Sequence, residues 1–361
     1  MHVTRLSLKD FRNYCEQSVE LSPKTNLIYG KNAQGKTNIL EAVYMFSQGK
    51  SHRAKSDKEL IRFGSDMFRA AVEFETSERE YKSVMTFAKN GKKSISINNV
   101  PIKKLSMLMN YLNTVMFSPE DLNLVKGSPS VRRKFVDLAI SQLFPSYLVS
   151  LIDYSKSLVQ KNSLLKSMKY TKQSDVMLDV WNEQLSVEGA KIMRQRLEFL
   201  DLLKGFAENI QSEISGEKLE LIFMPGIKLE SITSEDYYKA LEQNKKREID
   251  MQTAICGIHR DDVRISINGS EAKLYASQGQ QRTAALTLKI ALSDYMHHIK
   301  DEYPVLLLDD IMSELDKSRR LYLAEKIKDK QVLITSTDTD ILQSTEGTKL
   351  FYVENGIIKE K

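Results

Sequence analysis

The sequence predicts an α/β fold in which a head is built from both ends of the chain and a helical lobe is inserted between them. Three observations lead to this prediction. A glycine-rich loop follows an apolar strand near the N-terminus, a second apolar strand near the C-terminus ends in two aspartates, and a long stretch without proline lies between them. The 361 residues leave room for about two or three domains.

The glycine-rich loop covers residues 30–37 and fits the pattern of a P-loop, with a predicted strand at 25–29 before it and a predicted helix at 38–46 after it. Glycines allow the tight turn that points backbone N–H groups at phosphate oxygens. Lys36 would reach the terminal phosphates and Thr37 would bind Mg²⁺. A merely structural glycine-rich turn would leave Lys36 unexplained. The predicted phosphate-binding residues are Gly30, Lys31, Asn32, Ala33, Gln34, Gly35, Lys36 and Thr37.

The elements around this loop follow from apolar periodicity. Alternating apolar residues predict two strands before the loop, within 3–11 and 14–21. Further strands are predicted after its helix, at 68–74, 82–87 and 94–97, and a hairpin turn at 89–91 joins the last two. Residues 146–224 lack proline and carry apolar residues near helical spacing, which predicts an antiparallel helix pair interrupted at 169–174. Strands are expected again at 218–223 and 262–267, then after a turn at 268–269 also at 273–275. A helix at 278–296 and an α/β run complete the chain.

The second apolar strand, 305–308, ends in Asp309 and Asp310, which is the form of a Walker B segment. Asp309 suits Mg²⁺, bound directly or through water. Asp310 would orient or deprotonate the attacking water. A strand followed by a helix cap is the plainer alternative for this segment taken alone.

A second anion site is predicted at the start of the helix that follows Ala276. The sequence Ser277-Gln278-Gly279-Gln280 presents a hydroxyl, backbone N–H groups and the positive end of a helix dipole. The residues expected to bind nucleotide there are Ser277, Gly279 and Gln280. The presence of two anion sites in one chain implies that both kinds of site bind the same nucleotide.

These motifs together, with Ser313-Glu314-Leu315-Asp316, resemble the ABC-type ATPases, in which the signature serine and glycine of one subunit cap the γ-phosphate held by the P-loop of the other. Further segments resemble the RecF family of bacterial DNA replication and repair proteins. They are residues 6–14, 117–122, 125–133 and 257–262. One departure is Ile258, where this family usually has proline; no proposed phosphate ligand is affected.

The resemblance implies a head similar to those of the structural-maintenance-of-chromosomes ATPases, with a short helical arm in place of a long coiled coil. It divides the chain into residues 1–118 (head with P-loop), 119–248 (arm) and 249–361 (head with signature and Walker B). It further implies ATP and Mg²⁺ as cofactors, a homodimer that forms on ATP, slow DNA-dependent hydrolysis that serves as a switch, and roles in gap repair, recombinase loading and the SOS response. The implied partners are DNA (single-stranded, duplex or gapped), RecO, RecR and RecA.

The net charge of +5 permits DNA as a partner without requiring it. The arm is locally basic, with twelve Lys or Arg against six acidic residues between 126 and 196, and the alternative is a solvated helix face. A second basic cluster is predicted after the P-loop helix at Lys50, His52, Arg53 and Lys55. The twelve basic arm residues are Lys126, Arg132, Arg133, Lys134, Lys156, Lys161, Lys166, Lys169, Lys172, Lys191, Arg194 and Arg196.

Other residues leave alternatives open. His259 and Arg260 suit either a polar cluster near the nucleotide or a loop in which Arg260 pairs with the aspartates that follow it. Arg12 and Asn13 resemble residues that touch phosphates in related heads. One hydroxyl among residues 335–338 is expected to sense the γ-phosphate, and Trp181 fits a helix core.

The composition also sets aside several classes. The two cysteines, Cys15 and Cys256, form no C-x-x-C and the histidines no H-E-x-x-H, which indicates a reducing cytoplasm and no structural zinc. No signal peptide or membrane span is expected. An ABC transporter ATPase would have a much shorter spacing between its Walker motifs. A P-loop kinase or GTPase would leave residues 277–282 unexplained and, for a GTPase, lacks an Asn-Lys-x-Asp motif.

Overall fold

The computed structural model describes residues 1–168, 175–337 and 347–361, and the chain separates into two compact units. Unit 1 comprises Met1–Asp121 and Ala285–Lys361, and unit 2 comprises Leu122–Ala284. The predicted interruption at 169–174 and Asp338 lie outside the described residues. The functional boundaries at 118 and 248 stay a prediction. Residues 249–284 belong to the same compact unit as the arm.

The described residues of unit 1 form two six-stranded sheets. The first is antiparallel, in the order β2-β1-β4-β5-β6-β7. Its strands are β1 (His2–Phe11), β2 (Tyr14–Glu20), β4 (Met67–Glu75), β5 (Glu80–Ala88), β6 (Lys93–Ile97) and β7 (Val100–Pro101). Inward and outward residues alternate along β4 and β5, as expected for a sheet with one solvated face.

The second sheet has the order β15-β14-β3-β13-β12-β8, with the strands from β14 to β8 parallel. Its strands are β3 (Thr25–Tyr29), β8 (Thr114–Phe117), β12 (Val305–Asp309), β13 (Val332–Ser336), β14 (Lys349–Glu354) and β15 (Ile357–Glu360). Strands β8, β12 and β13 are buried throughout except at Asp309, which explains their continuous apolar runs. Segments about 300 residues apart in sequence become neighbours here, because β13 pairs with β3.

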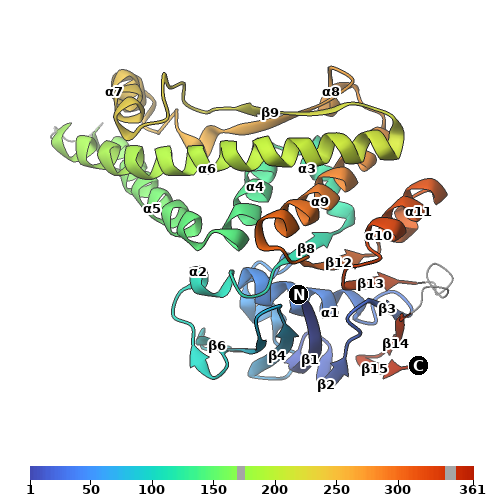
Figure 1. Cartoon of the computed structure of the whole chain (residues 1–361). Helices are drawn as coiled ribbons and strands as arrows, with labels where there is room; N and C mark the ends of the chain where they lie inside the picture. The colour runs from blue at the N-terminus through green and yellow to red at the C-terminus, as the bar shows by residue number, and fades with distance from the viewer. Residues whose placement is uncertain (169–174, 338–346) are drawn as a thin grey trace. The chain divides into compact units, whose positions relative to one another are not determined.

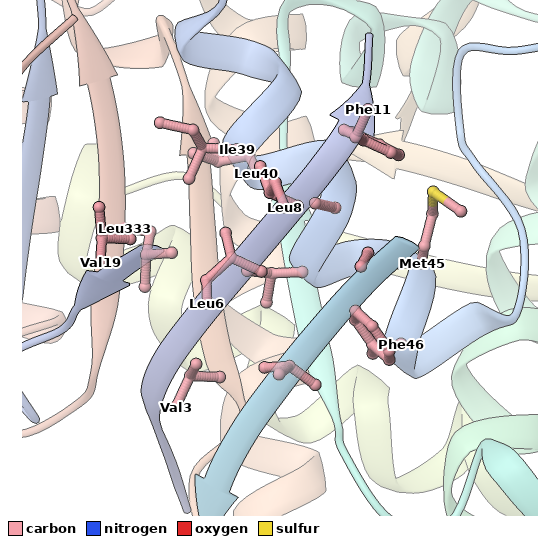
Figure 2. Packing of buried hydrophobic residues seen from close by; sticks show 14 of the residues in the cluster. Val3, Leu6, Leu8, Phe11, Val19, Ile39, Leu40, Met45, Phe46 and Leu333 are labelled. Atoms are coloured by element: carbon pink, nitrogen blue, oxygen red, sulfur yellow. The ribbon is translucent and has the colours of Figure 1, made fainter. Parts of the chain in front are cut away.

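The core of unit 1 lies between the antiparallel sheet and the helix α1 (Lys36–Gln48) (Figure 2). Side chains from β1 and β2 meet the apolar face of α1 and Leu333 from β13. This packing fixes the helix that follows the P-loop against both sheets. The remaining helices of the unit are η1 (Asp57–Leu60), α2 (Leu105–Leu108), η2 (Pro119–Leu122, its last residue in unit 2), α10 (Ile311–Glu314), α11 (Lys317–Lys326) and most of α9 (Gln278–Lys300).

Unit 2 is mainly helical and carries a three-stranded antiparallel sheet in the order β11-β10-β9. Its long helices α5 (Pro145–Met168) and α6 (Asp175–Ser215) form the predicted pair (Figure 1). The other elements are α3 (Asn123–Lys126), α4 (Pro129–Leu143), β9 (Leu219–Met224), α7 (Ser234–Met251), η3 (Ile258–Arg260), β10 (Asp262–Ile267), β11 (Ser270–Glu271) and α8 (Ala272–Tyr275).

The strand predicted at 273–275 is wrong. The turn at Asn268 and Gly269 returns the chain for only two residues, Ser270 and Glu271, and the next four form the one-turn helix α8. Ala272 is buried whereas Lys273, Leu274 and Tyr275 are exposed. The three consecutive exposed residues do not have the alternation of a half-buried strand.

Candidate functional site

The P-loop in unit 1 is held in its turn by specific contacts. Gly30 has φ +147° and a Cβ there would lie 2.3 Å from the Val353 carbonyl oxygen; Gly35 has φ +111° and a Cβ would lie 2.5 Å from the Asn13 side chain. Only glycine fits both positions. Asn13 Nδ2 donates to the Gln34 carbonyl at 2.7 Å, which ties the β1–β2 turn to the loop.

Two further contacts support the loop, and sequence reasoning missed both. The Tyr14 hydroxyl donates to the Gly35 carbonyl at 2.9 Å, and the Asn355 N–H donates to Gln34 Oε1 at 2.7 Å. No local pattern signals them, because Asn355 lies at the far end of the chain. Residues 31–33 of the loop are exposed, as a phosphate site requires.

The Lys36 ammonium is buried at the base of the loop. Its Nζ donates to the carbonyl oxygens of Gly30 at 2.5 Å and Lys31 at 2.9 Å. Burial lowers the pKa of Lys36, and the charges of Asp310 and Asp309 act in the opposite direction. The P-loop lysine and the Walker B carboxylates are therefore close enough to interact electrostatically within unit 1.

Thr37, Asp309 and Thr335 meet in unit 1. The Thr37 and Thr335 hydroxyls both donate to Asp309 Oδ1 at 2.8 Å. Thr335 Oγ1 also accepts the Asp310 N–H at 3.0 Å. Parallel pairing of β12 with β13 sets Asp309 opposite Thr335, so the carboxyl ends of the strands converge at one edge.

This arrangement fits a magnesium ion. The Thr37 hydroxyl and the Asp309 carboxylate are oxygen donors, the kind of ligand that Mg²⁺ takes in proteins, and they come from the two predicted metal residues. Among the hydroxyls at 335–338, Thr335 is the one that the structure joins to both Walker B aspartates. The sequence left that choice open.

Asp310 begins the helix α10 in a left-handed conformation with φ 53°. Ser313 Oγ donates to the Asp310 carbonyl at 2.8 Å, and Asp316 caps α11 by accepting the Arg319 N–H at 2.9 Å. The Asp310 carboxylate is half-buried at the end of β12.

The predicted signature residues lie in unit 2. Ser277 precedes α9, where its hydroxyl accepts the Gln280 N–H at 3.3 Å and its own N–H donates to Gln280 Oε1 at 2.8 Å, which is a capping box. Gln280 Nε2 also donates to Glu217 at 2.6 Å. Ser277 is exposed and Gly279 is half-buried, so the helix start is accessible from solvent.

The remaining candidates have protein partners. Arg12 donates from Nε and Nη2 to both carboxylate oxygens of the fully buried Glu41, at 2.9 and 2.6 Å. His259 Nδ1 lies 3.0 Å from the Tyr154 hydroxyl, and Arg260 donates to the Ala254 carbonyl at 3.1 Å. The alternative in which Arg260 pairs with the aspartates that follow it is not what the structure has, because those aspartates bind other arginines.

Asp261 binds Arg196 at 2.7 Å and Asp262 binds Arg132 at 2.7 Å. Both arginines belong to the basic set of the arm and are almost fully buried. Lys161 is also buried and lies 2.6 Å from Glu248. These three cations are neutralised inside unit 2, so the charge surplus counted from the sequence overstates the basic surface of the arm.

The second basic cluster is also smaller than predicted. Lys50, Arg53 and Lys55 are exposed, but His52 is half-buried with its ring centroid 5.1 Å from that of Tyr44. Burial lowers the pKa of His52. Burial therefore disfavours the charged form of His52.

With this geometry in view, the similarities to known proteins are specific. The RecF/RecN/SMC N terminal domain family matches residues 2–359. The chain belongs to this family. It is 41% identical over its full length to the "DNA replication and repair protein RecF" of Halalkalibacterium halodurans, which it covers completely, and 40% identical to that of Bacillus cereus over 99% of the chain and 98% of the relative.

Comparison with solved structures supports the same family assignment. A RecF bound to ATP, described as a recombination mediator protein in the RecFOR pathway, matches with a TM-score of 0.93 and 35% identity, covering 99% of this chain and 97% of that one. An Smc head domain from Pyrococcus furiosus matches with a TM-score of 0.59 at 18% identity, over 100% of this chain and 96% of that one, which supports the fold alone. The predicted ABC-type head is confirmed.

Among the described residues, none of the helices is both long and apolar enough to cross a membrane. The family match and the length of chain between the Walker motifs set this protein apart from the transporter ATPases, kinases and GTPases considered above.

Proposed function

We propose that this protein is an ATP-gated DNA-binding protein of replication and recombinational gap repair. The observation that carries the proposal is the meeting of Thr37, Asp309 and Thr335 beside the exposed P-loop residues 31–33. Such a site binds a nucleoside triphosphate with Mg²⁺, which supplies positive charge to the phosphates when bound. The names of the relatives, and the ATP-bound relative, support ATP and DNA as ligands.

Closure of two protomers on ATP is part of this proposal. Ser277 and Gly279 present a second helix start in unit 2, whereas the P-loop is in unit 1. Our proposal is that Ser277, Gly279 and Gln280 of one protomer cap the γ-phosphate bound by the P-loop of its partner. ATP then acts as the ligand that joins the two copies.

Hydrolysis reopens the dimer in this scheme. Lys36 stabilises the charge on the phosphates, Thr335 holds Asp309 in place, and Asp310 orients the attacking water. Aspartate is one methylene shorter than the glutamate usual in ABC transporters, so we expect slow turnover that DNA stimulates. In this proposal, hydrolysis acts as the switch from the closed dimer to the open one.

DNA binding is assigned to the exposed cations of both units, without base-specific contacts. Apart from Lys156 and Lys191, which pair with Asp153 and Glu188, the exposed members of the two sets are Lys126, Lys134, Lys166, Arg194, Lys50, Arg53 and Lys55. Single-stranded, duplex and gapped DNA are all candidate ligands. Family membership supports RecO, RecR and RecA as further partners, cytoplasmic localisation, and a role in the SOS response.

Gapped-DNA binding measured with ATP, with ADP and without nucleotide across a salt series tests the proposal. We expect tighter binding with ATP and a steep loss of affinity with salt. Lys36→Met should remove the ATP effect and keep the basal affinity. Equal binding under all three nucleotide conditions would overturn the proposal that ATP gates DNA binding. If Lys36→Met lost basal DNA binding as well as the ATP effect, nucleotide and DNA would share one site.

A further inference from the structure

A groove in unit 2 lies outside the nucleotide machinery, along the antiparallel pair α5 and α6 (Figure 1). It is an open cavity of about 670 Å³, which is in the size range of binding sites. Ser157 Oγ donates to Gln184 Oε1 at 3.0 Å across it and fixes the register of the two helices. The lining residues are Asp153, Lys156, Ser157, Gln160, Trp181, Glu183, Gln184, Val187 and Glu188.

The groove continues into exposed apolar side chains at both ends. On α6, Met177 and Val180 each lie four residues before a lining residue and are 49% and 40% exposed; Val187, itself in the lining, is 39% exposed. On α5, Val149 lies four residues before Asp153 and is 45% exposed. Residues three or four apart share one helix face, so Met177, Val180, Trp181 and Val187 form an apolar stripe on α6 beside the polar lining residues of α5. Solvated helices without a partner rarely keep such a stripe.

The rim of this stripe is acidic. Asp153, Glu183 and Glu188 line the groove against a single cation, Lys156, which pairs with Asp153 at 3.0 Å. Glu188 pairs with Lys191 at 2.8 Å, while Glu183 makes no ion pair with any residue that the structure describes. With two of the three carboxylates paired, Glu183 keeps an unpaired negative charge at the groove, which favours a cationic partner over the phosphates of DNA.

We propose that the groove between α5 and α6 binds an amphipathic helix of another protein, with an apolar stripe flanked by Lys or Arg. Helix-in-groove recognition uses anchors at positions i, i+3, i+4 and i+7, and a third helix laid on two antiparallel ones buries their free apolar face in a small bundle. Trp181 and Val187 receive the apolar anchors. Glu183 pairs with a flanking cation.

A second copy of this chain is a poorer occupant. A symmetric pair of grooves would place the same acidic rims opposite each other, because both surfaces of a two-fold interface are identical. The carboxylates of Asp153, Glu183 and Glu188 would then repel their counterparts. A cationic helix has the complementary charge.

Trp181 makes a direct test possible, since it is the one tryptophan in the chain. The probe is a synthetic peptide of about 18 residues, or about 27 Å as a helix, with a leucine stripe flanked by lysines and no aromatic residue. Titration into the full-length protein without nucleotide should shift the Trp181 emission and saturate. Two control peptides have glutamate in place of lysine, or the same composition in scrambled order, and both should bind at least about tenfold more weakly.

Matched variants locate the site. Val187→Arg, in the groove, should lower the affinity for the leucine–lysine peptide by about tenfold or more. Val159→Arg should change that affinity by less than about twofold. Val159 is a fair control because it is 65% exposed on α5 and lies outside the lining. Both variants should keep the unfolding temperature and ATP-dependent gapped-DNA binding, so failure here leaves the proposed function standing.

Three results would overturn the inference. They are absence of saturable binding up to about 1 mM peptide, equal affinity for the scrambled peptide, and equal weakening by the two variants. A nucleotide-free dimer in light scattering that Val187→Arg dissociates would also refute it, by showing that a second copy occupies the groove.

Discussion

Thr335 illustrates how one hydroxyl joins two parts of the nucleotide site. It donates to Asp309 and accepts the N–H of Asp310, so it fixes the carboxylate proposed for Mg²⁺ and the start of the segment that carries the proposed base. The residue is buried and belongs to β13. Its role depends on position as much as on chemistry, since β13 is the strand paired with both β3 and β12.

Thr335→Val should lower ATP turnover by at least about tenfold and reduce the free energy of unfolding by about 1–3 kcal/mol, because the half-buried N–H of Asp310 loses its acceptor. Thr335→Ser should restore most of the turnover. Steady-state hydrolysis and urea unfolding measure the two effects. Normal turnover in the valine variant would contradict the assignment.

His259 gives unit 2 a dependence on pH. Burial lowers its pKa to about 4, reinforced by the cations of Arg260, Lys161 and Arg133, while the Ala254 carbonyl acts in the opposite direction. The neutral ring accepts the hydrogen bond of Tyr154 at Nδ1. In the unfolded chain the histidine takes up a proton near pH 6.5, so the unfolded state binds more protons below that pH.

The free energy of unfolding should therefore fall as the pH drops from about 6.5 to about 4, by at most about 3 kcal/mol for this residue. His259→Gln should flatten this part of the stability curve. Chemical denaturation of both proteins at a series of pH values is the measurement. Parallel curves for the two proteins would remove His259 as the cause.

At the scale of elements, unit 2 is joined by buried ion pairs. Lys161 on α5 and Glu248 on α7 are fully buried and 2.6 Å apart, and Glu248 also accepts the Ile255 N–H at 3.0 Å. Arg196 on α6 binds Asp137 on α4 and Asp261 after η3. These pairs determine which helices pack together.

Glu248→Ala should lower the free energy of unfolding by about 3–5 kcal/mol, because it leaves the buried Lys161 ammonium without a partner. The double variant Lys161→Met, Glu248→Met should lower the free energy of unfolding clearly less, since no charge remains unpaired. Urea unfolding of the single and double variants separates the cases. A double variant at least as unstable as Glu248→Ala would show that packing rather than charge is responsible.

Much of the head could be predicted from the sequence because its signals are local. The P-loop, the apolar strands β3 and β12 and the helix α9 each follow from a pattern a few residues long. The buried arm cations could not be predicted, since Arg132 binds an aspartate 130 positions away. Similarly, the strand expected at 273–275 depended on a turn signal that the structure uses for only two paired residues.

For the whole molecule, the central claim is that one nucleotide is held by two copies of the chain. In our proposal, the P-loop with Asp309 forms one part of the site, and the capped helix start at Ser277 of the partner forms the other. A site completed by a partner makes assembly depend on ATP. Variants that damage different parts should then complement each other.

The most direct measurement is light scattering of Lys36→Met, Ser277→Arg and their equimolar mixture with ATP and Mg²⁺. Each variant alone should remain monomeric. The mixture should contain dimers, because a heterodimer combines the intact P-loop of one chain with the intact Ser277 of the other. If the mixture is as monomeric as the separate variants while the unmodified protein dimerises, the shared site is contradicted.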